Sequence, residues 1–164
     1  MILLTTKRVR LRRFLKTDLS SLRQMMSNPN VMKFTGFKTP QSEEKIQECL
    51  AKWTKPAIPQ LGVWAACLLE TDELFGWFML TPTINEHSPE IGFMLREEFW
   101  GQGLTSEVSA ALISYGFDQL NLKRIIASTH VNNHSSICIL KKLGMSRFDY
   151  DQAAPEILYF EKKN

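Results

Sequence analysis

"WGQGLTSE", residues 100–107, places two glycines, Gly101 and Gly103, directly before a helical pattern. Glycine weakens both strands and helices, so a pair at this junction indicates an unusual backbone shape or a close approach by a ligand. The first amides of a helix lack intrahelical partners and carry partial positive charge, and together they form an anion site. From this loop alone, a diphosphate site and a tight turn without ligand are equally compatible with the sequence.

The length and composition predict one folded domain over residues 1–164. Hydrophobic residues make up 44% of the 164 positions and charged residues 23%, which is ordinary for a globular protein. The sequence has no apolar stretch near the roughly twenty residues that span a bilayer. Near the N-terminus the basic residues follow the apolar ones, the reverse of a secretory signal. These features predict a cytoplasmic protein without a membrane partner.

The three cysteines, Cys49, Cys67 and Cys138, form an odd set without a paired CxxC spacing. This pattern argues against a disulfide framework and against a zinc cluster. The sequence therefore predicts that all three pack as small apolar side chains and that the protein needs no metal.

The basic stretch "KRVRLRR", residues 7–13, alternates arginines with Val9 and Leu11. Alternation predicts a half-buried strand that projects Arg8, Arg10 and Arg12 on one face. That face is either a solvated edge strand or a phosphate-binding surface of a ribosome-associated or nucleic-acid-binding module. The sequence shows no accompanying aromatic stacking set, and its net charge is only +3, so the solvated strand is favoured.

Apolar periodicity predicts an α/β domain with a mixed, mostly antiparallel sheet flanked by helices. Short polar separators between the middle strands favour an antiparallel meander. Thr17 or Asp18 and Ser42 are expected to cap the two early helices, and Gly144 to end the last one. The expected strands are 7–15, 62–70, 74–80, 90–95, 123–129, 146–151 and 156–163, and the expected helices are 17–28, 42–53, 105–119 and 135–144.

Three further stretches complete a pattern: "PEIGFML" before the glycine loop, "NNHSSICILKKLGM" after it, and "TKRVRLRRF" with an "NPNV" turn near the start. The order strand, W-G-x-G, helix, strand, N-x-x-S, helix, L-G resembles the GNAT superfamily of N-acetyltransferases. Over nearly the whole chain it is most similar to the branch with the ribosomal-protein-alanine N-acetyltransferases. The resemblance implies direct transfer of acetyl from acetyl-CoA, the co-substrate, to a primary amine on a protein N-terminus or a small molecule. A monomer or homodimer without a metal is expected.

The resemblance also implies which residues hold the cofactor. The diphosphate would lie on the glycine loop, and the pantetheine arm would pair with the backbone of Met94 and Leu95, beyond a splay or bulge in the strand from Glu90, where Gly92 would ease such a bulge. The loop departs from the usual Gln/Arg-x-x-Gly-x-Gly/Ala in having Trp100 first and Thr105 last, and Met145 replaces a usual phenylalanine. The cofactor-binding residues so implied are Phe93, Met94, Leu95, Gly101, Gln102, Gly103, Leu104, Thr105, Ser106, Asn133 and Ser136.

Catalytic roles follow from the needs of amine acetylation. The last helix has no tyrosine, so the resemblance assigns Ser136 to assist the leaving thiol, with an N-cap as its alternative role. Glu90 and Glu156, each expected at the start of a strand, are the candidate bases. The remaining candidates, taken as surface histidines or as core and pocket walls, are His87, His134, Phe34, Trp64 and Trp77. A non-catalytic acyl-CoA sensor on the same fold is a further alternative.

Overall fold

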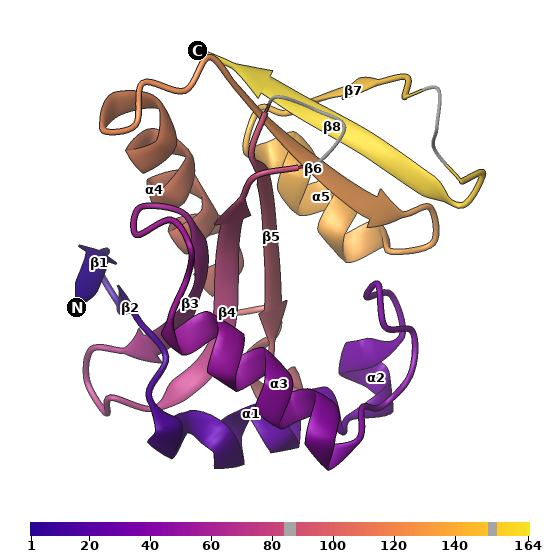
Figure 1. Cartoon of the computed structure of the whole chain (residues 1–164). Helices are drawn as coiled ribbons and strands as arrows, with labels where there is room; N and C mark the ends of the chain where they lie inside the picture. The colour runs from indigo at the N-terminus through magenta and orange to yellow at the C-terminus, as the bar shows by residue number, and fades with distance from the viewer. Residues whose placement is uncertain (84–87, 151–153) are drawn as a thin grey trace.

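A computed structural model describes residues 1–83, 88–150 and 154–164. Within these ranges the chain forms one mixed sheet with helices before, between and after its strands (Figure 1). The strands are β1 (Ile2–Thr5), β2 (Val9–Arg12), β3 (Gly62–Leu68), β4 (Leu74–Thr81), β5 (Glu90–Leu95), β6 (Arg124–His130), β7 (Ser146–Phe148) and β8 (Ile157–Lys163). The helices are η1 (Lys16–Asp18), α1 (Leu19–Met26), α2 (Pro29–Met32), α3 (Glu43–Thr54), η2 (Glu97–Phe99), α4 (Leu104–Asp118) and α5 (His134–Lys142).

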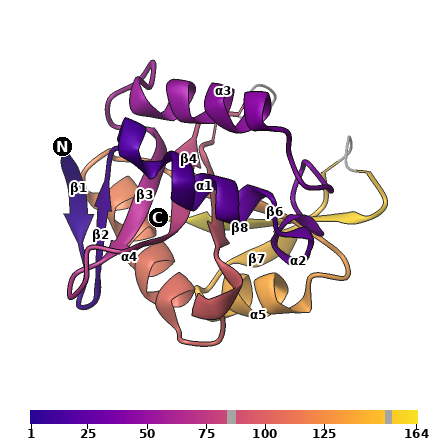
Figure 2. The same ribbon diagram turned by 90° about the horizontal axis from the view of Figure 1, so that it is seen from below.

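The sheet has eight strands in the order β1-β2-β3-β4-β5-β6-β8-β7. Neighbouring strands in the sheet are antiparallel, except for β5 and β6, which are parallel. Helices α1 and α3 lie on one face and α4 and α5 on the other (Figure 2). The predicted α/β class with a mixed, mostly antiparallel sheet is confirmed.

Each face of the sheet has its own apolar core. Under α4 and α5 the core includes Phe78 from β4 and Phe160 from β8, so this layer joins early and late strands. Under α1 and α3 the buried residues of the core all lie between Phe14 and Met94. Among the residues that the structure describes, only those on the α4/α5 face form a core with members from both early and late strands.

The N-terminal region differs from expectation in two elements. The first predicted strand, 7–15, contains β2, which forms a hairpin with β1, a strand that was not predicted; a bond from the Thr6 amide to the Val9 carbonyl (2.8 Å) closes the hairpin. The turn "TKR", residues 6–8, lacks glycine, asparagine and proline, so its sequence gives no hairpin signal. Asn28 does not simply end a helix, because its side chain accepts from the Asn30 amide (2.9 Å) and starts the short helix α2.

The expected caps have different outcomes. Ser42 caps α3 by accepting a bond from the Lys45 amide (3.3 Å), and Gly144 follows α5 with a φ of +73°, as predicted. Asp18 occupies the N-cap position of α1, one of the two positions predicted, but its carboxylate makes no cap bond to that helix. It accepts instead from the Leu15 amide (2.7 Å) and from both terminal nitrogens of Arg12 (2.8 and 2.9 Å).

Two of the three cysteines are buried as predicted, and the strand with the arginines does not lie where it was predicted to lie. Cys49 and Cys67 are buried thiols, and burial raises the pKa of Cys67 to about 11, whereas Cys138 is exposed, which corrects the expectation that it packs inside. All three are free. The strand with Arg8, Arg10 and Arg12 is not an edge, because β1 covers it, and each of these arginines pairs with a carboxylate.

Candidate functional site

The candidate site begins where two neighbouring strands separate in the middle of the sheet. Strand β5 pairs with β4 over its whole length, from Glu90 to Leu95. Its parallel pairing with β6 is confined to Glu90 and Ile126, supported by a bond from the Ile126 amide to the Pro89 carbonyl (3.0 Å). Beyond this point β5 runs toward α1 while β6 and β8 swing away (Figure 1).

The backbone of β5 offers its free polar groups to this opening. The Arg96 amide donates to the Phe75 carbonyl of β4 (2.8 Å), and peptide groups alternate along a strand. By this alternation Met94 turns its amide and carbonyl toward β4, whereas Phe93 and Leu95 turn theirs toward the opening. The Leu95 carbonyl accepts a bond from the indole nitrogen of Trp100 (3.1 Å).

The bulge expected at Gly92 is absent from the described pairing of β4 and β5, whose register runs on without a shift. Gly92 is instead required by packing, since a Cβ atom there would lie 2.6 Å from the terminal methyl of Met79. The opening therefore arises from strand separation and not from an extra residue.

The glycine loop directly follows this strand and η2. Gly101 and Gly103 have φ angles of +74° and +76°, the left-handed region that favours glycine. Gly103 is the N-cap of α4 and no side chain caps the helix, so the amides of its first turn are not used by a cap. A Cβ atom on Gly101 would meet nothing within 4 Å, which leaves open space in front of the loop.

The remaining residues that the resemblance implies for the loop differ in which of their groups a ligand could reach. Thr105 and Ser106 lie half-buried in the first turn of α4, where their amides and hydroxyls are close to the N-terminus of the helix. The side chain of Leu104 is buried in the core, which leaves only its backbone for a ligand. Gln102 is held by bonds to the Glu98 carbonyl (2.9 Å) and from Arg8 (3.0 Å).

Glu90 lies at the point where β5 and β6 part. Its carboxylate accepts a short bond from the Ser128 hydroxyl of β6 (2.5 Å). Tyr159 stands opposite Ser128 on β8, and its pKa is raised by burial and by the nearby charges of Glu90 and Tyr150. Since Met94 belongs to the α1/α3 core, alternation places Glu90 on that same face.

Glu156 does not join Glu90. It precedes β8 and its carbonyl accepts from the Val131 amide (2.8 Å), beyond the end of β6. Five residues of strand separate Ile126 from Val131, about 16 Å at the usual rise. The Glu156 carboxylate lies 3.7 Å from the ammonium group of Lys38, in the segment between α2 and α3.

Ser136 is the third residue of α5 and is not its cap. Asn133 caps the helix by accepting from the Ser136 amide (3.2 Å), so the alternative role for the serine is wrong and its hydroxyl is not used for capping. Helix α5 lies on the face opposite Glu90 (Figure 2). His134 is an exposed residue of the first turn, and His87 lies outside the described residues.

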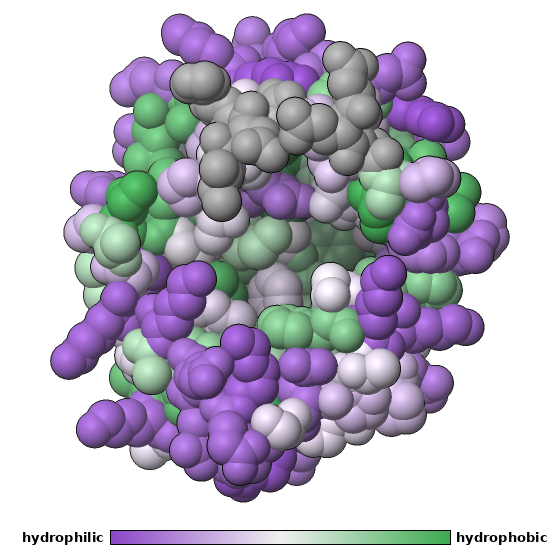
Figure 3. All heavy atoms as spheres, turned by 45° about the vertical axis from the view of Figure 1, so that its right-hand side comes forward, coloured by the Kyte–Doolittle hydropathy of each residue, from purple (hydrophilic) through white to green (hydrophobic). Residues whose placement is uncertain are grey.

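Of the three aromatic candidates, two lie in the cores and one lies beside the opening between β5 and β6. Trp64 and Trp77 are buried in the two cores, and their role as pocket walls stays a prediction. Phe34 packs on His130 of β6 with ring centroids 5.4 Å apart, which brings the chain after α2 against the far end of the opening. On this side the surface is hollowed, with apolar residues on the floor and hydrophilic residues around the rim (Figure 3).

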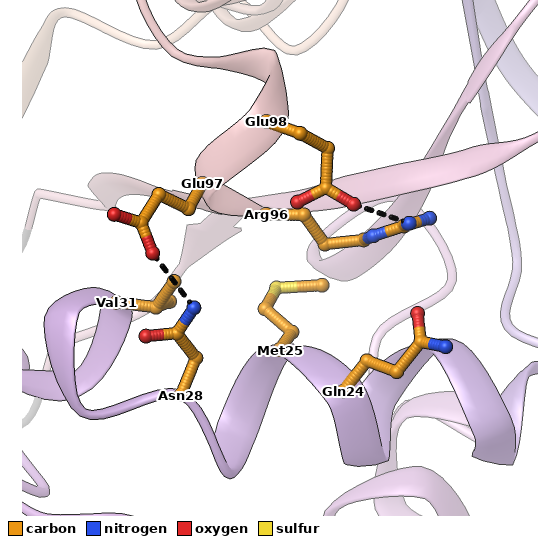
Figure 4. A pocket seen from close by; sticks show the side chains of 7 residues that line it. All are labelled: Gln24, Met25, Asn28, Val31, Arg96, Glu97 and Glu98. Atoms are coloured by element: carbon orange, nitrogen blue, oxygen red, sulfur yellow. Dashed lines mark hydrogen bonds and ion pairs between the residues drawn. The ribbon is translucent and has the colours of Figure 1, made fainter.

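A polar cavity of about 300 Å³ lies between α1 and η2, just before the glycine loop. Two pairs of its lining side chains interact (Figure 4): Asn28 donates to Glu97 (2.9 Å), and Arg96 pairs with Glu98. Glu97 also accepts from Asn30 (3.0 Å). These bonds connect the turn between α1 and α2 to the segment that leads into the loop.

Sequence reasoning missed several residues of this region. Ser128 and Tyr159 gave no signal because only the pairing of β6 with its neighbours brings them to Glu90. Arg8 and Glu107 are about 100 residues apart in sequence yet form an ion pair at the loop (2.7 Å). In the described ranges there is no group of three or more His, Cys, Asp or Glu residues that could hold a metal ion. The same ranges contain no helix long and apolar enough to cross a membrane.

Comparison with known proteins agrees with this geometry. Residues 8–146 match the acetyltransferase (GNAT) domain family. The chain belongs to the GNAT acetyltransferase family. It is 31% identical over 144 residues to the Bacillus subtilis N-acetyltransferase YnaD, covering 88% of this chain and 82% of that protein.

Solved structures share this GNAT fold over the whole chain. A GNAT-family acetyltransferase from Bacillus anthracis superposes with a TM-score of 0.86 at 24% identity, covering 99% of this chain and 98% of that one. The ribosomal-protein acetyltransferase RimL, solved in complex with coenzyme A, has a TM-score of 0.78 at 16% identity, with 99% and 98% coverage. The expected family is thus confirmed.

Proposed function

We propose that this GNAT enzyme transfers acetyl from acetyl-CoA directly to a primary amine, on a protein N-terminus or a small molecule, in the cytoplasm. The observation that carries the proposal is the opening between β5 and β6 that leads into a left-handed glycine loop and an uncapped helix N-terminus. A sheet rarely leaves backbone groups unpaired at its centre without a partner for them. The free thiols, one of them exposed, are typical of a reducing compartment.

The loop and strand fit the two ends of the cofactor. The amides from Gly103 to Ser106, with the hydroxyls of Thr105 and Ser106, would hold the diphosphate, as the family relative solved with coenzyme A supports. The backbone of Phe93 and Leu95 would pair with the pantetheine arm in place of the expected Met94 and Leu95, because Met94 turns its amide and carbonyl toward β4. Asn133 and Ser136 would lie near the sulfur of the arm. When bound, acetyl-CoA supplies the activated thioester.

The two proton transfers of the reaction would use side chains on opposite faces of the sheet. Glu90, oriented by Ser128, faces the α1/α3 side and would accept a proton from the amine, directly or through water. Ser136 begins α5 on the opposite side and would assist the leaving thiol, which needs little help because thiol pKa values lie near about 8.5. A free amide of Phe93 or Leu95 would polarise the thioester carbonyl. The ion pair of Glu156 with Lys38 favours Glu90 as the base.

The two other classes of function lack this support. The three arginines of β2 and the turn before it are paired with carboxylates, which lowers their capacity to bind phosphate. A non-catalytic acyl-CoA sensor would share the cofactor geometry. Turnover with an amine distinguishes the enzyme from the sensor.

The test is a binding titration followed by an amine screen. A cofactor a hundredfold above its dissociation constant adds about 2.7 kcal/mol of stability, so acetyl-CoA and coenzyme A should raise the melting temperature while ATP and NAD should not. Consumption of acetyl-CoA with amino-terminal peptides or small amines then supports the enzyme. No stabilisation by either coenzyme A species would overturn the proposal.

Two substitutions locate the site. Gly103→Val should abolish cofactor binding, because a β-branched residue does not tolerate a φ of +76°. Gly36→Val is the matched control, since a Cβ atom there meets nothing within 4 Å and its φ is not in the strained range. Ser136→Ala should slow turnover modestly with unchanged cofactor affinity. Normal acetyl-CoA affinity in Gly103→Val would contradict the assignment of the loop.

A further inference from the structure

The turn between β1 and β2 is bonded to the first turn of α4. The Thr6 hydroxyl donates to one carboxylate oxygen of Glu107 (2.6 Å), and the Arg8 amide donates to the same oxygen (2.9 Å). The side-chain Nε of Arg8 donates to the other oxygen (2.7 Å). Three donors from one turn thus converge on a single carboxylate about 100 residues away.

Arg8 also reaches the glycine loop itself. Its Nη1 donates to the Gln102 carbonyl (3.0 Å), the residue between the two left-handed glycines. Its Nη2 lies 3.6 Å from the position that a Cβ atom on Gly103 would occupy. A single planar guanidinium therefore links the loop to the helix it precedes.

The charge of Glu107 gives this link a consequence for anion binding. A carboxylate in the first turn of a helix is favourable to the helix but repels an anion at the same N-terminus. Burial raises the pKa of Glu107, yet the bonds from Thr6 and Arg8 outweigh burial and leave the pKa below its ordinary value. Glu107 is therefore ionised at neutral pH, and Arg8 is the cation that offsets it.

We propose that Arg8 is a positioning residue for the cofactor: it holds the glycine loop through Gln102 and neutralises Glu107 beside the diphosphate. This rests on the proposed function, because it concerns the same loop. Thr6 supports Arg8 by fixing the orientation of the carboxylate. The N-terminal hairpin thus serves the cofactor site from outside the glycine motif.

If Arg8 both holds the loop and neutralises Glu107, single and double variants should differ in their affinity for acetyl-CoA. Arg8→Ala should weaken acetyl-CoA binding about tenfold and raise KM for acetyl-CoA, with kcat within about twofold of wild type. Arg8→Lys keeps the charge and should retain most of the affinity. Glu107→Gln in the Arg8→Ala background should recover at least about threefold, because the uncompensated carboxylate is removed. A purely structural contact predicts no such recovery.

The control is Arg10→Ala in β2, two residues after Arg8. Arg10 pairs with the exposed Asp72 of the β3–β4 turn and not with Glu107, and 29% of its side chain is exposed against 43% for that of Arg8. Its removal should leave acetyl-CoA affinity unchanged. Melting temperatures of all variants, measured without ligand, show whether each is folded.

The experiment is calorimetric titration with acetyl-CoA for wild type, Arg8→Ala, Arg8→Lys, Arg10→Ala and the double variant Arg8→Ala/Glu107→Gln. The expected order of affinity places wild type, Arg10→Ala and Arg8→Lys first, the double variant next and Arg8→Ala last. A wild type that binds with Arg8→Ala equal to Arg10→Ala overturns this inference and leaves the proposed function standing. A double variant no better than Arg8→Ala overturns the charge role. A wild type that does not bind overturns both proposals.

Discussion

Strands β1 to β5 and strands β6 to β8 form two parts of one sheet that are held together in different ways. The first part is a continuous antiparallel arrangement with an apolar core on each face. The second part pairs β6 with β8 over seven residue pairs, yet meets β5 at one pair. The joint depends on side chains of the α4/α5 core, where Phe78, Ile125 and Phe160 meet.

This difference explains how a sheet can hold an opening at its centre. Apolar packing on one face keeps β5 and β6 in place, so hydrogen bonds between them are not needed for the whole length of the strands. On the other face, the core formed by the described residues does not extend beyond Met94, and under the proposed function this face would receive the amine. The comparison predicts that substitutions in the first part cost stability, whereas equivalent ones in the second part cost less.

The largest effect is expected at the buried ion pair of the first part. Arg12 and Asp18 have 16% and 6% of their side chains exposed, and the bond also orders the start of α1. Arg12→Ala leaves the Asp18 carboxylate buried without its cation and should cost about 3–5 kcal/mol in the free energy of unfolding, measured by urea denaturation. A loss below about 1 kcal/mol would contradict the view that this half is the rigid one.

Next comes the pairing of β4 with β5. A Cβ atom on Gly76 would lie 2.6 Å from the Met94 carbonyl, a backbone atom that cannot turn aside, so Gly76→Ala should cost about 2 kcal/mol. Gly92→Ala is the control, because its clash is with the flexible end of Met79 and should cost less. Thermal unfolding of both variants measures the difference. Equal losses would mean that the strand yields as easily as a side chain.

A smaller effect is expected from the ion pair of the second part. Arg124 and Glu161 join β6 to β8 and are more exposed than Arg12 and Asp18, at 26% and 18%. Arg124 also lies over the Phe148 ring, 4.6 Å from its centroid. Arg124→Ala should therefore cost about 1 kcal/mol in urea denaturation. A cost as large as that of Arg12→Ala would remove the contrast between the two parts.

The smallest effect is expected in the pH dependence of folding stability, through a carboxylate of the second part. Burial raises the pKa of Glu161, but hydrogen bonds from Lys163 and Arg124 outweigh it and lower the pKa below its ordinary value of 4.5. The resulting stability is present above pH 4.5 and is lost as the pH falls through the lowered pKa. Melting temperatures between pH 6 and 3 should fall less steeply in Arg124→Ala than in wild type. Parallel curves would show that this carboxylate is not coupled to folding.

Local patterns predicted those features that depend on neighbours in the sequence. The left-handed glycines, the cap at Ser42 and the strands of the middle meander follow from residues within one turn or one strand. The wrong predictions concern features that residues close together in the sequence do not specify. The hairpin of β1 lacks turn residues, and the exposure of Cys138 and the cap at Asn133 depend on exactly where α5 begins. The site residues themselves stay predictions.

By itself, the sequence determined the α/β class, the glycine loop before α4 and the family resemblance, because each depends on residues close together in the chain. The resemblance left a splay and a bulge open in the strand from Glu90. Only the tertiary structure decided that β5 and β6 separate there without a bulge, that Ser128 meets Glu90, and that Arg8 reaches Glu107. Those contacts join segments far apart in the sequence. Periodicity carries no information about them, since they depend on how strands pair and on which face each side chain lies.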